Sequence, residues 1–223
     1  MAIYYHLWTC DERDNNYVTM QENLYGAPSV FQSYIPYFCR ACRHVDKKAI
    51  FESREGFEAG PQIRVKTGRE FAHSGEGFLL IETRLLKLLK KHRVAGYAAR
   101  PIPQTDWHVL RVTATVPFKK FKPTYDGPAF PACKVCGYRA YYGVVQALHQ
   151  IGVPKEENTL FTPEYERPQG QDVLLTEKAA LMLKHNQARG ASMNRLLTHE
   201  EYKLIEADTP QVRRKIKGRY IFL

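Results

Sequence analysis

Two short stretches decide the fold of this chain: CRAC at residues 39–42 and CKVCG at residues 133–137. Two residues between paired cysteines let both thiolates converge on one cation from a tight turn. Two such turns complete the tetrahedral four-thiolate shell that zinc prefers in structural sites. The spacing therefore predicts one structural zinc ion. Its expected ligands are Cys39, Cys42, Cys133 and Cys136.

Other uses of these thiols stay open at this point: two disulfides, redox-active pairs of the thioredoxin type, or unrelated buried thiols. The N-terminal stretch MAIYYHLW lacks the charged region and cleavage site of a signal peptide, and disulfides are rare in reducing compartments. A redox-active pair needs a helix N-terminus, a context that the residues before Cys39 do not provide. His44 and His108 are alternative ligands, although a surface or hydrogen-bonded histidine is the more common case. Cys10 is expected to pack as a small apolar side chain.

Four thiolates fill the coordination shell of zinc and leave no position for water or substrate, so the expected site is structural rather than catalytic. Gly137 follows Cys136 directly, which suits a turn in which backbone N–H groups point at the sulfurs. The first pair has Arg43 at that place. The cations expected to offset the negative charge of the site are Arg40, Arg43, Lys134 and Arg139.

The two cysteine pairs lie at a fixed offset, from Cys39 to Cys133 (133 − 39 = 94). Further residues that this offset matches without a gap are residues 79–81 with residues 173–175 and Gly96 with Gly190. The match fades between these anchors, and a tandem duplication would produce such a pattern. The predicted fold class is α+β, with two α/β halves that such a duplication would relate, joined by a four-cysteine zinc site.

The predicted halves are residues 1–122, with the first cysteine pair, and residues 123–223, with the second. The proline-rich residues 123–131 are the best place for a boundary. A single compact domain is the alternative.

Three helices are indicated by capping residues followed by apolar residues at helical spacing. Thr83 is expected to cap the first helix and Thr176 the second. Thr198 and Glu201 form a capping box that opens a third helix, which should run to about residue 206.

A half-buried strand is predicted at residues 107–116, because apolar and polar residues alternate there. The side chains expected on its buried side are Leu110, Val112, Ala114 and Val116. Weaker strand predictions fall on residues 3–8, 63–66 and 219–222.

The chain has an ordinary globular composition, with 44% hydrophobic and 25% charged residues in 223. No apolar run approaches the roughly 20 residues that cross a bilayer, so we expect a soluble, cytoplasmic protein without a membrane partner. The net charge of +10 attracts polyanions without choosing among nucleic acid, an acidic membrane surface and an acidic protein. Short basic clusters fall at residues 87–93, 119–122 and 213–217. The catalytic and nucleotide-binding motifs G-x-S-x-G, H-E-x-x-H, Walker A and G-x-G-x-x-G are absent, and no enzyme activity is expected.

Three stretches suggest a family: LLIETRLLKLLKKHRVAGY at residues 79–97, WHVLRVTATVPF at residues 107–118 and PACKVCG at residues 131–137. With two distant CxxC pairs, they resemble the double-CXXCG motif proteins of myxobacteria and their relatives, over roughly residues 35 to 195. The positions that match the family pattern are Cys39, Cys42, Cys133, Cys136 and Gly137. Arg43 departs from it, because a second glycine is expected there.

Members of that family are described as immunity proteins, which bind a cognate toxin inside the producing bacterial cell and block it. The resemblance therefore implies a zinc-stabilised binding protein with a protein toxin as its partner, and no enzyme. A pI near 9.4 suits a toxin with an acidic surface. The alternative is a zinc-containing nucleic-acid-binding protein that uses the basic clusters and some of its 14 tyrosines.

Overall fold

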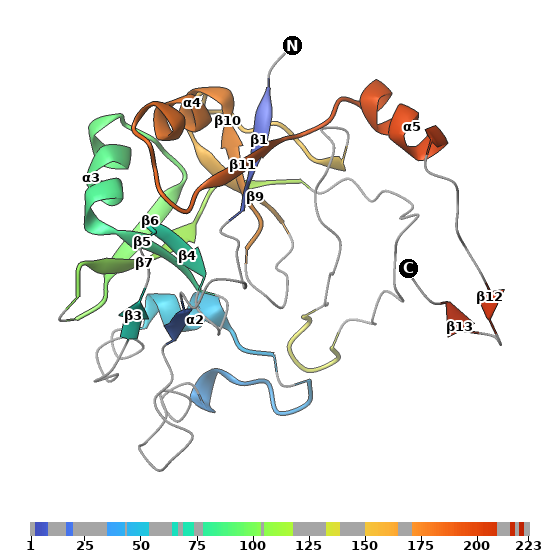
Figure 1. The fold of residues 1–223 in the computed structure, drawn as a ribbon. Helices are drawn as coiled ribbons and strands as arrows, with labels where there is room; N and C mark the ends of the chain where they lie inside the picture. Colours follow the sequence, from blue (N-terminus) through green and yellow to red (C-terminus); the bar gives the residue numbers. More distant parts are fainter. Residues whose placement is uncertain are drawn as a thin grey trace.

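The computed structural model shows an α+β fold with two main β-sheets (Figure 1). The structure describes residues 3–8, 17–19, 35–42, 44–53, 64–66, 69–73, 78–103, 105–117, 133–138, 150–164, 171–208, 215–216 and 219–220. The first sheet has the order β4 (Phe71–His73), β5 (Leu79–Glu82), β7 (Trp107–Val112) and β6 (Tyr97–Pro101). The second has the order β11 (Ser192–Arg195), β1 (Tyr4–Trp8), β10 (Val173–Thr176), β9 (Leu160–Pro163) and β8 (Thr115–Val116).

Smaller elements complete the described part of the chain. Two further strand pairs are β2 (Tyr17–Thr19) with β3 (Arg64–Lys66) and β12 (Lys215–Ile216) with β13 (Arg219–Tyr220). The helices are the 3-10 turn η1 (Ile35–Tyr37), α2 (Lys47–Glu52), α3 (Thr83–Lys91), α4 (Glu177–His185) and α5 (His199–Asp208).

The four strands of the first sheet, in the order β4-β5-β7-β6, correspond in position to β9-β10-β1-β11 of the second sheet. Of these last four strands, β1 alone comes from the N-terminal end of the chain. In the first sheet β7 lies between β5 and β6, and in the second β1 lies between β10 and β11. The register agrees as well: Leu110 of β7 faces Leu79, and Leu7 of β1 faces Val173, which follows Leu79 by 94 residues (173 − 79 = 94). The N-terminal strand therefore completes the sheet of the C-terminal half.

Helices α3 and α4 follow the same offset, because both ends of Thr83–Lys91 and Glu177–His185 differ by 94 (177 − 83 = 94 and 185 − 91 = 94). Both helices end in the same way. Arg93 and Gln187 lie just beyond them and adopt positive φ angles of 52° and 50°, which few non-glycine residues do. A tandem duplication would leave this correspondence, and the duplication itself stays a prediction.

The two halves dock on each other through the loops that follow these helices. The carbonyl oxygen of Ala95 accepts the N–H of Leu160 in β9 at 3.0 Å. In the opposite direction, the carbonyl oxygen of Arg189 accepts the N–H groups of Glu70 and Phe71 at 2.8 and 3.3 Å. Each half thus contributes a loop to an edge strand of the other half's four-strand unit, the reciprocity expected around an approximate twofold axis.

Glycines stand at both docking points because the backbones approach too closely there for a side chain. Gly96 has a φ of 82° and Gly190 a φ of 81°. A Cβ on Gly96 would lie 2.0 Å from the carbonyl oxygen of Leu160, and one on Gly190 would lie 2.7 Å from that of Phe71. The two glycines of the predicted repeat therefore permit the contact between the halves.

Apolar side chains are buried on both faces of each main sheet. One cluster mixes residues of both halves and includes buried side chains of α3 and α4. A second cluster packs Phe51 of α2 against Trp107 of β7 on the outer face of the first sheet. A third lies on the second sheet and includes Tyr4 of β1 and Leu174 of β10. The cluster shared by the halves is the main apolar contribution to their association.

The strand predicted at residues 107–116 is wrong in extent. It breaks after Val112, and the chain resumes with the two-residue strand β8. Trp107 and Val109 are buried together with Leu110 and Val112, because α2 covers the face that was expected to be polar. Apolar and polar residues do alternate along this stretch, but buried side chains lie on both faces of the strand.

The cap predicted at Thr83 is wrong, because Glu82 is the N-cap residue of α3. Thr176 is the N-cap residue of α4 as predicted, but without a side-chain bond to that helix, and the capping box is confirmed. Thr83 lies inside α3, and its hydroxyl donates to a distant backbone carbonyl at 2.8 Å. Thr176 does precede α4, but its hydroxyl makes no bond to that helix and accepts the N–H of Thr159 at 3.1 Å. Thr198 and Glu201 exchange bonds of 3.2 and 2.8 Å at the start of α5.

The weaker strand predictions correspond to β1, β3 and the described part of residues 219–222, which is β13. The boundary at residues 123–131 and the basic residues 119–122 lie outside the described residues. The division into residues 1–122 and 123–223 stays a prediction, and β1 and β8 both pair with strands of the second half.

Glu70 is fully buried, with an exposed fraction of 0%, and joins the two halves through its side chain as well. The carboxylate accepts two hydrogen bonds from the guanidinium of Arg84 and the backbone N–H of Arg189 at 2.9 Å. Desolvation alone would raise the pKa of Glu70, but these donors outweigh it and hold the pKa below its usual value.

We predict that Glu70→Gln destabilises the protein by about 1–3 kcal/mol at neutral pH, because the half-exposed Arg84 loses its counter-charge. The folded-state pKa is depressed, so the carboxylate stabilises the fold above the unfolded-state pKa of 4.5 and loses this effect as pH falls through the folded value. Urea unfolding should therefore show a difference from wild type that shrinks below about pH 4. Glu52→Gln, at an exposed carboxylate, is the control. A Glu70→Gln effect that is independent of pH would contradict the assignment.

Candidate metal centre

The four predicted ligands converge on one point. The sulfurs of Cys39 and Cys133 lie 3.8 Å apart, and those of Cys42 and Cys136 lie 3.6 Å apart. All four ligand atoms lie within 4.8 Å of one another, and none of these cysteines forms a disulfide. A tetrahedral zinc ion with bonds of about 2.3 Å to sulfur sets neighbouring sulfurs roughly 3.8 Å apart. The cluster therefore has the dimensions of a tetrahedral metal site.

Both cysteine turns have the same backbone construction. The N–H of Cys39 bonds to the carbonyl oxygen of His44 at 2.9 Å, and the N–H of Cys133 bonds to that of Tyr138 at 2.8 Å. Gly137 adopts a φ of 73°, and its N–H bonds to the carbonyl oxygen of Cys133 at 2.8 Å. The glycine predicted to suit a knuckle has the positive φ that such a turn needs.

The first thiol of each pair is the more acidic one. The backbone N–H groups of Cys136 and then Val135 bond to the sulfur of Cys133 and lower its pKa to about 6. The N–H groups three and two residues after Cys39 lower the pKa of that thiol in the same way. Backbone donors of this kind stabilise a thiolate, which is the form that binds a metal.

The second thiol of each pair behaves in the opposite way. The backbone N–H of Tyr138 lowers the pKa of Cys136, but desolvation and the three neighbouring thiols outweigh it and raise the pKa to about 12. The N–H of His44 likewise lowers the pKa of Cys42, and so does the thiol of Cys136, but desolvation and the thiols of Cys39 and Cys133 raise it overall. Four sulfurs this close cannot all ionise by themselves, and a cation among them removes the repulsion.

An aromatic pair covers the junction of the two turns. His44 stacks on Tyr138 with ring centroids 3.4 Å apart and an angle of 7° between the rings. Burial lowers the pKa of His44, and the charge of Lys47 lowers it further, so the neutral imidazole is favoured. His44 was considered as a ligand, and the structure makes it a stacking partner instead. Tyr138 was missed, although both residues follow the first cysteine of their pair by five positions (44 − 39 = 5 and 138 − 133 = 5).

The remaining sequence predictions for the site have different outcomes. His108 lies on β7 and is not among the metal-binding groups found in the described residues. Arg40 and Lys134 are exposed beside the cluster, as a charge-compensating role requires. Cys10, Arg43 and Arg139 lie outside the described residues.

No protein-family model matches this chain, and no curated protein matches it either. Within the described residues, every helix is too short or too polar to span a membrane. The interpretation of the site therefore depends on its geometry. Four sulfur donors lie together, and backbone N–H groups favour their thiolate forms. The cluster found among the described residues has no fifth protein ligand.

We predict that the purified protein carries about one metal ion per chain and that Cys133→Ser lowers both the metal content and the melting temperature. Losing the link between the halves should lower the free energy of unfolding by roughly 3 kcal/mol and the melting temperature by about 6–12 °C. Elemental analysis and thermal unfolding measure the two effects. Val135→Ser, in the same turn but with an exposed side chain that is not a ligand, should retain the metal. Full metal retention in Cys133→Ser would refute a shared site.

Proposed function

We propose that the four cysteines bind one structural Zn²⁺ ion and that the protein is an immunity-type binding protein, which neutralises a cognate toxin by direct binding. The observation that carries the first part is the pair of sulfur distances, 3.8 and 3.6 Å, which match the edge of a ZnS₄ tetrahedron. Tetrahedral sulfur sites take zinc or iron, and a zinc site without redox chemistry suits a structural link.

A closed thiolate shell supports binding rather than catalysis. Zinc catalysis needs a coordination position for water or substrate, and four cysteines occupy all four positions. The ion would instead fix the two cysteine turns against each other, because each turn comes from a different half of the chain. A protein held together in this way offers a surface of fixed shape to a partner.

The immunity role itself is supported by the resemblance to the double-CXXCG motif proteins. A net charge of +10 favours a toxin with an acidic surface, since complementary charge steers association and selects the partner. The proposed location is the bacterial cytoplasm, where thiolates stay reduced and a toxin can be blocked before it acts.

The test is to express the protein with the toxin encoded beside its gene. We expect the two proteins to copurify and growth to be protected, and we expect Cys133→Ser to weaken protection while Val135→Ser retains it. Growth arrest that this protein does not relieve, with the protein folded and zinc-loaded, would exclude the immunity role.

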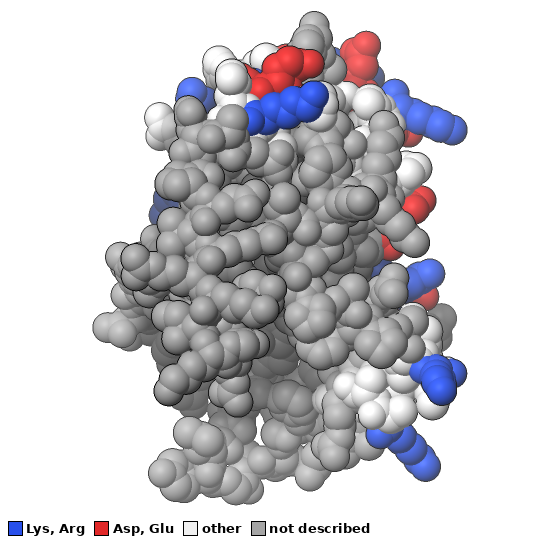
Figure 2. Space-filling view, turned by 90° about the vertical axis from the view of Figure 1, so that its right-hand side faces the viewer, with Lys and Arg blue, Asp and Glu red and all other residues white. Residues whose placement is uncertain are grey.

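The alternative, a zinc-containing nucleic-acid-binding protein, is supported by the exposed basic residues in and just after α3. These are Lys87, Lys90, Lys91, His92 and Arg93. On the face shown in Figure 2, some described basic side chains lie beside acidic ones, and two others lie near each other at the lower right without an acidic neighbour in view. Binding of DNA or RNA that weakens steeply as salt rises, in the absence of any toxin effect, would favour this alternative.

A further inference from the structure

Half of the sulfur ligands in the cysteine cluster face solvent. Figure 1 shows the two cysteine turns side by side, the first in light blue and the second in yellow. Cys42 and Cys136 are exposed, whereas Cys39 and Cys133 are partly buried. The two exposed sulfurs come from different halves of the chain and lie 3.6 Å apart. A small molecule in solution can therefore reach both of them.

The second cysteine turn is open on its outer side. Among the described residues, a Cβ added to Gly137 would meet no atom within 4 Å. The side chain of Val135 is 73% exposed, and Lys134 is exposed beside it. In the first turn, Arg40 and Ala41 are exposed as well. Access to the two exposed sulfurs therefore needs no movement of the main sheets.

The exposed pair lies close to the distance of a disulfide. The sulfurs of a disulfide are about 2.05 Å apart, so those of Cys42 and Cys136 have to approach each other by roughly 1.5 Å. Rotation of two surface side chains covers a distance of this size. An oxidised sulfur at either position therefore has a second sulfur within reach.

Other contacts hold the halves together if the metal leaves. The N–H of Leu160 bonds to the carbonyl oxygen of Ala95 at 3.0 Å, and the N–H of Arg189 bonds to the carboxylate of Glu70 at 2.9 Å. A disulfide would add a covalent link between residues 94 positions apart (136 − 42 = 94). The oxidised chain should therefore stay folded and return to the reduced form with a thiol reductant.

We propose that Cys42 and Cys136 are an oxidative modification site, at which a peroxide forms one disulfide between the halves and the metal is released. The proposal rests on the proposed zinc site, whose regulation it describes. It assigns a different role to each sulfur of a cysteine turn. The partly buried sulfurs only bind the metal, whereas the exposed sulfurs also react.

The step is a two-electron oxidation of two thiolates by one molecule of hydrogen peroxide. One thiolate attacks the peroxide, the O–O bond breaks, and a sulfenic acid and a hydroxide ion form. The other thiolate attacks that sulfur, so the S–S bond forms, the S–O bond breaks and a second hydroxide leaves. The chain then keeps only Cys39 and Cys133 as ligands, which is too few for a four-coordinate site.

The test is to treat the reduced, metal-loaded protein with hydrogen peroxide, to measure released zinc with a chromogenic chelator and to map the disulfide after alkylation of free thiols. Trypsin places each cysteine of the cluster on a peptide of its own. The cleavage sites that separate them follow Arg40, Arg43, Lys134 and Arg139. We expect residues 41–43 to be joined to residues 135–139, with about one zinc released per disulfide.

A main product with any other disulfide, such as Cys39 with Cys42 inside one turn, would overturn the proposal. Zinc that stays bound while peroxide is present in excess would overturn it as well.

Cys39→Ser is the matched control for Cys42→Ser, because each variant removes one ligand of the same turn. Cys39→Ser retains the exposed pair and should still join residues 41–43 to residues 135–139. Cys42→Ser should form a disulfide several-fold more slowly, because only one exposed sulfur remains. Equal rates in the two variants would contradict the assignment to the exposed pair. The wild-type map decides the matter if a variant does not fold.

The metal content before peroxide is added separates this proposal from the proposed zinc site. Protein that carries no metal refutes the zinc site, and the disulfide map of the reduced protein then still decides whether the exposed pair reacts. Zinc-loaded protein that does not react supports the zinc site and refutes the oxidation. Neither result depends on a toxin, so the immunity role is tested separately.

Discussion

The carbonyl oxygens of Ala95 and Arg189 accept backbone hydrogen bonds from β9 and β4, the edge strands of the opposite units. These bonds need close contact between two backbones, and only glycine fits at the next position, Gly96 and Gly190. The same contact brings α3 and α4 into one apolar cluster, and Glu70 adds a buried charge across it. Backbone hydrogen bonds, an apolar cluster and a buried carboxylate therefore all connect residues of the two halves.

The cysteine cluster follows from this arrangement. Each short sulfur distance joins cysteines that are 94 residues apart. Two halves related by an approximate twofold axis would bring equivalent turns together in this way. His44 and Tyr138 meet there for the same reason. A metal at this point ties segments that are distant in sequence and holds the halves in register.

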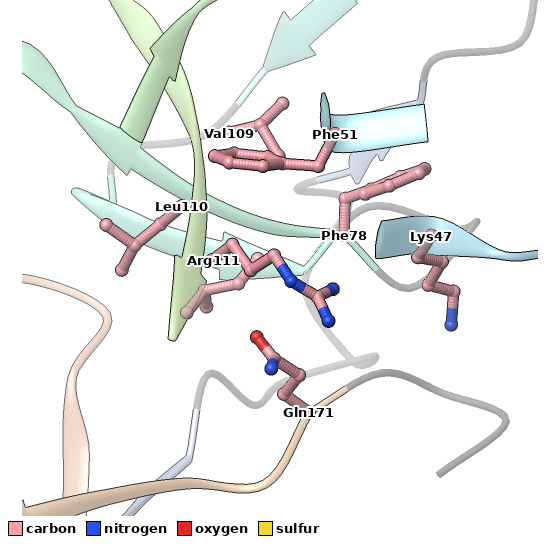
Figure 3. A pocket seen from close by; sticks show the side chains of 8 residues that line it. Lys47, Phe51, Phe78, Val109, Leu110, Arg111 and Gln171 are labelled. Carbon is pink, nitrogen blue, oxygen red and sulfur yellow. The ribbon is translucent and has the colours of Figure 1, made fainter. Parts of the chain in front are cut away.

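The sequence predicted that Cys39, Cys42, Cys133 and Cys136 come together, because two local turns carry them. The 94-residue offset also correctly aligned α3 with α4. It did not predict that β1 takes the place of β7 in the second sheet, because strand pairing is non-local. Thr83 is not the N-cap of α3, and Thr176 is the N-cap residue of α4 without a side-chain bond to it, because both hydroxyls bond to residues outside these helices. Arg111 was expected on the polar side of its strand, but α2, Phe78 and Gln171 line a small pocket around it (Figure 3).

X-ray absorption at the zinc edge of the purified protein tests the central claim most directly, because it reads the number and kind of ligand atoms. The account predicts four sulfur neighbours at about 2.3 Å and no nitrogen or oxygen in the first shell. A first shell that contains light atoms would mean that a histidine or water replaces a cysteine. Purified protein that carries no zinc and whose cysteines are paired as disulfides would contradict the account altogether.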